Sequence, residues 1–125
     1  MNLTEIFSII FIHWFADFVL QTDKQAKGKS TNWSDLLSHT FMYSVTFWGL
    51  LSLLNPLFNM SLSFHFSFYF WLITFVCHTI TDYFTSRLNS RLWAKGDVHN
   101  FFVSIGFDQV LHYVQLFTTY YLLKS

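Results

Sequence analysis

Apolar side chains dominate four stretches of this chain, and polar or charged residues fill the connections between them. A helix needs about 20 mostly apolar residues to cross a hydrocarbon layer of roughly 30 Å, and each stretch has that length. The pattern predicts an all-α, integral membrane four-helix bundle with up-down-up-down topology, forming one domain over residues 1–125. The predicted helices cover residues 3–21, 35–55, 64–84 and 101–123.

The three connections differ in character. Residues 22–34 are polar and predict a loop. Residues 85–100 carry apolar side chains at helical spacing beside basic ones, which predicts a short interfacial helix between the third and fourth membrane helices. Residues 56–63, which begin with Pro56, predict a turn.

Composition supports a membrane location. The chain is 53% hydrophobic, 22% aromatic and 11% charged, which is too apolar for an ordinary soluble domain, so we expect the lipid bilayer as a partner. The net charge of zero gives no reason to expect nucleic acid, and Cys77 has no second cysteine for a disulfide. The first apolar stretch lacks the positive leading region of a signal peptide, so we expect it to be retained.

Basic residues predict the orientation. Six of the seven lysines and arginines fall in the two longer connections, and such residues concentrate on the cytoplasmic side of a membrane. We therefore expect both termini outside and both longer connections inside. The six are Lys24, Lys27, Lys29, Arg87, Arg91 and Lys95.

Each apolar stretch also has one histidine and one aspartate four residues apart, a spacing that puts both on the same helix face. Their order reverses from one stretch to the next, so in an up-down-up-down bundle all eight side chains fall in the cytoplasmic half. They form one predicted ring. The pairs are His13 with Asp17, Asp35 with His39, His78 with Asp82, and Asp108 with His112.

A divalent cation is the economical way to compensate several carboxylates in a membrane, where each costs roughly 2.5–3.5 kcal/mol near the centre. Imidazole and carboxylate ligands without thiolate suit Zn, Mn, Fe or Mg, and eight donors provide for one or two ions. Direct hydrogen bonding between histidine and aspartate is the main alternative. Asp35 also fits a second interpretation, because a carboxylate in the first turn of a helix is favoured by the helix dipole.

The two halves of the chain repeat a pattern. HWFADF in the first predicted helix matches HTITDY in the third, and DLLSH in the second matches DQVLH in the fourth. We interpret this as a tandem duplication of a helical hairpin.

The segments HWFADFVLQTDKQAKGKS, LLSHTFMYS, HTITDYFTSRL and GFDQVLHY together resemble an uncharacterised family of small prokaryotic and phage membrane proteins, domain of unknown function 3307. The resemblance spans nearly the whole chain. It implies a prokaryotic inner membrane but carries no activity with it, so no catalytic residue is assigned. A looser likeness to membrane-bound metal-dependent hydrolases favours hydrolysis.

We therefore expect a metal-dependent hydrolase that acts on an amphiphilic or lipid-linked phosphoester, with Arg87, Arg91 and Lys95 binding the substrate phosphate. The bias of basic residues towards the cytoplasm explains these three equally well. Two alternatives stay open. One is a noncatalytic, metal-stapled module that docks a host or phage partner; the other is a metal or proton transporter, for which a homo-oligomer would provide the path.

Overall fold

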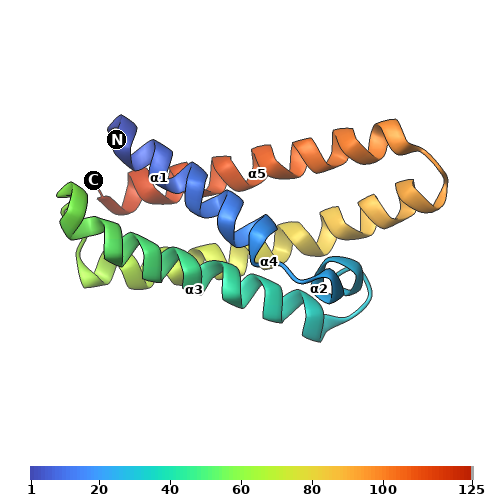
Figure 1. The fold of residues 1–125 in the computed structure, drawn as a ribbon, viewed down its shortest axis with the longest axis horizontal. Helices are drawn as coiled ribbons and strands as arrows, with labels where there is room; N and C mark the ends of the chain where they lie inside the picture. Colours follow the sequence, from blue (N-terminus) through green and yellow to red (C-terminus); the bar gives the residue numbers. More distant parts are fainter. Residues whose placement is uncertain (125) are drawn as a thin grey trace.

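The computed structural model describes residues 1–124, and all of its regular structure is helical, which confirms the predicted all-α class. Three long helices and one shorter segment pack as a ring in which α3 contacts α4, α4 contacts α5, and α1 contacts both α3 and α5 (Figure 1). The elements are α1 (Leu3–Trp14), a π-helical turn η1 (Phe15–Val19), α2 (Asp23–Gly28), α3 (Trp33–Phe58), α4 (Phe64–Ala94) and α5 (Val98–Lys124).

Local sequence signals set the ends of these helices. The side chains of Asn2, Thr22 and Ser63 each accept a hydrogen bond from a backbone N–H in the first turn that follows, at the starts of α1, α2 and α4. Asn59 ends α3 in the left-handed conformation, with φ at 50°, and Gly96 follows α4 with φ at 73°.

The structure corrects the predicted connections. The prediction of a separate interfacial helix within residues 85–100 was wrong. Nothing between Phe84 and Thr85 breaks the helix, and α4 continues to Ala94. The predicted loop at residues 22–34 contains α2, which a capping box at its first turn stabilises. Pro56 does not begin a turn but lies inside α3, where only the last turn loses a backbone hydrogen bond.

The two ends of the molecule carry different segments. Both termini lie with the α3–α4 turn at one end, whereas α2 and the α4–α5 connection lie at the other (Figure 1). The two basic connections therefore share an end.

The interior changes from apolar to polar along the molecule. Towards the termini, the helices enclose an apolar core that includes Ile9, Phe47, Phe70 and Leu116. Towards the other end the same inner faces carry histidine and aspartate, because every fourth residue faces inward. On α4 the inward residues are Phe66, Phe70, Thr74, His78, Asp82 and Ser86.

The outer surface is rich in large apolar side chains. Phe7, Leu53, Phe84 and Phe107, for example, are each 59–66% exposed. Within the described residues, α3 and α4 are long and apolar enough to cross a membrane. A buried polar cluster beneath an apolar surface is the reverse of the usual arrangement in soluble proteins.

Candidate metal centre

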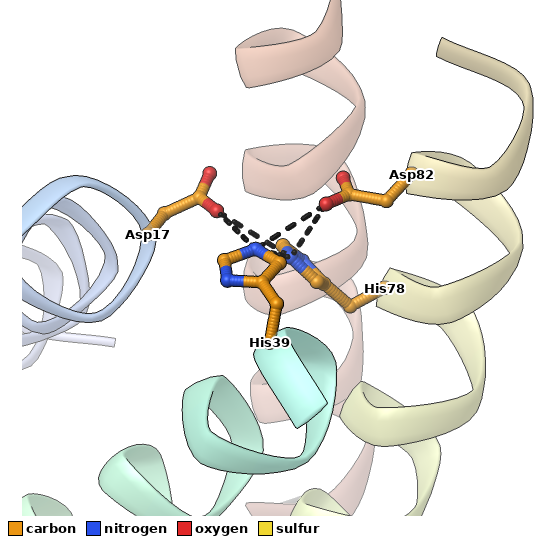
Figure 2. A group of neighbouring side chains, drawn as sticks. All are labelled: Asp17, His39, His78 and Asp82. Atoms are coloured by element: carbon orange, nitrogen blue, oxygen red, sulfur yellow. Dashed lines mark hydrogen bonds and ion pairs between the residues drawn. The ribbon is translucent and has the colours of Figure 1, made fainter. Parts of the chain in front are cut away.

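Four buried side chains from three elements converge at one point. Asp17 comes from η1, His39 from α3, and His78 and Asp82 from α4 (Figure 2). The Nε2 atom of His39 lies 3.0 Å from Asp17 Oδ1 and 3.3 Å from Asp82 Oδ2, and the Nε2 atom of His78 lies 3.5 Å and 3.4 Å from the same two oxygens. The two Nε2 atoms are 3.3 Å apart. We call these residues the four-residue group.

The separations within the four-residue group match a tetrahedral metal site. Zinc binds imidazole nitrogen and carboxylate oxygen at about 2.0–2.2 Å. Four ligands at the corners of a tetrahedron of that size lie roughly 3.3–3.5 Å from one another, and the measured pairs span 3.0–3.5 Å. An octahedral magnesium site needs about six oxygen ligands, which two imidazoles and two carboxylates do not provide. Two imidazoles and two carboxylates at these separations could therefore hold a tetrahedral ion such as zinc.

A second group shares a residue with the first. Asp17, Asp108 and His112 also offer ligand atoms within 4.8 Å of one another, and we call them the three-residue group. The Nε2 atom of His112 lies 3.1 Å from Asp108 Oδ2 and 3.1 Å from Asp82 Oδ1. Asp17 belongs to both groups and Asp82 contacts both, so these two carboxylates lie where bridging ligands of a two-ion centre would lie.

Asp17 lies on the π-helical turn η1, and its Oδ2 atom is 3.8 Å from His13 Nε2. The turn η1 breaks the regular α-helical spacing after Trp14, and such turns are rare and frequent at functional sites. Asp17 joins both groups, whereas His13, four residues earlier, joins neither.

His13 instead supports the site from one side. Its Nδ1 atom lies 2.6 Å from the hydroxyl of Tyr43, and its Nε2 atom lies 2.5 Å from Gln109 Oε1. The nitrogen that faces the amide oxygen must donate, so the other accepts from Tyr43. The ring of Tyr43 also stacks on His78, with centroids 3.8 Å apart, and fixes that imidazole.

The structure places the remaining predicted residues away from both groups. Asp35 is buried at the start of α3, where its carboxylate lies 3.8 Å from Lys24 Nζ. Arg87 donates a hydrogen bond to the carbonyl of Tyr83 and lies over that ring at 3.6 Å. Arg91 and Lys95 are exposed at the end of α4.

A cavity of about 550 Å³ reaches the centre from the end that carries α2. Asp17 and Asp108 form part of its wall, so the three-residue group faces the cavity. The remaining lining is mixed: it has apolar side chains such as Phe18 and Trp93, and basic ones from α2 and the residue after it, Lys27 and Lys29.

Lys29 was not identified as a site residue from the sequence. Its ammonium group lies 3.1 Å from Asp82 Oδ2 and is 18% exposed. Burial disfavours the charged ammonium, but the carboxylates of Asp82 and Asp17 outweigh burial and raise the pKa of Lys29. It lies in a connection, where helical periodicity gives no indication of side-chain direction.

Comparison with known proteins identifies a family but no activity. Neither the curated proteins nor the solved structures gave a match. The model of a family described as a protein of unknown function, DUF3307, matches residues 6–125. The match covers the His/Asp residues of both groups and confirms the resemblance seen in the sequence, so this chain belongs to the DUF3307 family.

Proposed function

We propose that this protein is an integral membrane, metal-dependent hydrolase that cleaves an amphiphilic or lipid-linked phosphoester at the cytoplasmic side of a prokaryotic inner membrane. One observation carries the proposal: two carboxylates of the buried three-residue group, those of Asp17 and Asp108, line a large cavity. Catalytic zinc sites keep a coordination position open for water, whereas structural sites use four protein ligands.

The two groups have different roles in this proposal. The four-residue group fills a tetrahedral set and stabilises the fold, and the three-residue group keeps one position for water or substrate. A bound ion would lower the pKa of that water to about 7 and polarise the phosphoryl oxygen. A nearby base then takes the proton.

Asp108 has two roles in this scheme: its Oδ2 atom would hold the ion beside His112, and its Oδ1 atom acts as the base. Its Oδ2 atom faces His112, while its Oδ1 atom is buried and has no hydrogen-bond partner within the described residues. Hydrolysis forms a bond between phosphorus and the water oxygen and breaks the bond between phosphorus and the ester oxygen. The proton from water passes to Asp108 and then to the departing alcohol.

The apolar core disfavours the transporter alternative. Ile9, Phe47, Phe70 and Leu116 fill the bundle between the centre and the end with the termini. A transporter needs access from both sides, usually through broken helices. The four-residue group, considered without the three-residue group, favours the noncatalytic alternative. A closed set of four protein ligands is typical of structural zinc.

The test is hydrolysis of dodecyl phosphate by detergent-purified, zinc-loaded protein, with release of inorganic phosphate as the measurement. We expect Asp108→Asn to lower turnover by about 10²–10⁴-fold, because removal of a general base has that effect. Asp23→Asn is the matched control. It makes the same carboxylate-to-amide change at a residue that is exposed and lies outside the centre. Equal turnover in the two variants would overturn the assignment of Asp108.

Elemental analysis of the same samples separates the alternatives. Bound zinc in wild type without any phosphate release would support the noncatalytic, metal-stapled module. Protein that retains no metal after gentle purification would contradict both the proposed metal centre and the proposed hydrolase activity.

A further inference from the structure

The long cavity follows one face of α4. Asp82, Ser86, Asn89 and Trp93 are spaced three or four residues apart, so they form one stripe. The last three line the cavity and span about 10 Å at 1.5 Å per residue. Asp17 of the four-residue group also lines the cavity, which therefore joins that group to an indole near the end of α4.

Several polar atoms along this cavity have no partner. The Ser86 hydroxyl, on a side chain that is 5% exposed, and the amide oxygens of Gln21 and Asn89 are buried without a hydrogen bond in the described part of the chain. All three residues line the cavity. Buried polar groups are nearly always hydrogen-bonded, so these atoms indicate a polar occupant.

Lys29 adds a positive charge at the same place. An ammonium group has three donors, and Lys29 uses one of them on Asp82. A hydrogen bond of 2.9 Å between Ser30 and Ser90 holds the segment that carries Lys29 against α4. Lys29 also lines the cavity, so its remaining donors are available to an occupant.

We propose that this cavity binds a phosphate ester, with Lys29, Ser86 and Asn89 holding the phosphate and Trp93 and Phe102 contacting the organic group. This assignment rests on the proposed function for its choice of ligand class. Lysine is a common phosphate ligand, a hydroxyl can donate, and a carboxamide can present its nitrogen by rotation. Trp93 and Phe102 line the cavity and are each about 60% exposed, so they offer apolar surface to a chain or ring.

The carboxylates of the cavity wall make this binding depend on metal. Asp17 and Asp108 also line the cavity, and like charges would repel a phosphate. A bound divalent ion would neutralise those two charges and would offer a direct ligand position to phosphate oxygen. We therefore expect tight binding in the zinc-loaded protein and weak binding after chelation.

The experiment measures calorimetric binding of inorganic phosphate and of dodecylphosphonate, which has no ester bond to cleave, to zinc-loaded protein in detergent. We expect dodecylphosphonate to bind more tightly, and Lys29→Gln to weaken both ligands by at least about tenfold, equivalent to 1.4 kcal/mol. Lys24→Gln removes the same charge from an exposed position five residues earlier, and should change affinity less than twofold. Lys29→Arg keeps the charge and should retain most of the affinity.

Each outcome distinguishes this site from the hydrolase. Equal affinities for Lys29→Gln and Lys24→Gln, with zinc content and helicity unchanged, would overturn the phosphate site. Equal affinities for phosphate and dodecylphosphonate would overturn the apolar contact. Zinc-dependent binding without hydrolysis would support the site and contradict the hydrolase, whereas hydrolysis that Lys29→Gln leaves unchanged would do the opposite.

Discussion

Asp17 is the residue at which the two candidate metal groups meet. Its Oδ1 atom faces both His39 and His78, and it also belongs to the group with Asp108 and His112. The side chain is 5% exposed and lies on the π-helical turn. Its removal therefore takes a ligand from both groups at once.

We predict that Asp17→Asn weakens zinc binding by more than about tenfold, since changes even to residues that support metal ligands cost 10–100-fold. Asp35→Asn should leave affinity within about twofold, because Asp35 lies beside Lys24 and outside both groups. Competition with a chromogenic chelator measures both values. Equal losses would show that Asp35 is a ligand after all, as its place in the predicted ring suggests.

At the scale of elements, α2 and the residue after it hold the lysine side chains of the cavity in place. Gly28, at the end of α2, packs against the start of α3 so closely that an added Cβ would collide with the Asp35 carboxylate and lie 3.1 Å from its Cβ. The Asp35 Cβ is fixed to the backbone and cannot rotate away. A side chain at position 28 must therefore turn the Asp35 carboxylate and move the end of α2 from the start of α3 by a few tenths of an ångström.

We expect Gly28→Ala to lower the free energy of unfolding by about 1–3 kcal/mol, the usual cost of overpacking. Gly49→Ala is the control, because an added Cβ there meets nothing within 4 Å and alanine favours a helix by up to about 1 kcal/mol. Thermal unfolding followed by circular dichroism measures both. A Gly28→Ala protein as stable as the Gly49→Ala protein would contradict the close packing of α2.

Helical periodicity predicted most of the elements and the meeting of most of the histidines and aspartates. Side chains four residues apart share a face whatever the surroundings, which is why His78 and Asp82 converge as expected. The π-helical turn was not predictable from helical periodicity, and His13 Nε2 still lies 3.8 Å from Asp17 Oδ2 across it. Lys29 was not identified as a site residue either, because only tertiary packing brings its connection onto α4.

At the scale of the whole molecule, the distribution of side chains supports a membrane location. Aspartate, histidine, serine and threonine are buried, and large apolar residues cover the outside. The two basic connections lie together at one end, opposite the termini (Figure 1). This arrangement agrees with a chain whose cavity end faces the cytoplasm.

Cysteine labelling of intact spheroplasts tests the orientation in a Cys77→Ser background. A membrane-impermeant maleimide should label Thr4→Cys directly, and should label Lys24→Cys and Lys95→Cys only after permeabilisation. The three positions are exposed at opposite ends of the molecule. Labelling of all three positions from outside would contradict the predicted orientation. Direct labelling at positions 24 and 95, with labelling at position 4 only after permeabilisation, would indicate the opposite orientation.

The length of α4 has a consequence for the proposed hydrolysis. Its 31 residues extend about 46 Å, well beyond a hydrocarbon layer of roughly 30 Å, so in a membrane-spanning arrangement its last turns would stand among the lipid headgroups. Ser86, Asn89 and Trp93 on those turns would then bring the cavity to the boundary between hydrocarbon and water. The proposed cleavage there would leave two fragments of opposite solubility: the phosphate would diffuse into water and the alcohol would return to the bilayer, so partitioning would clear the cavity.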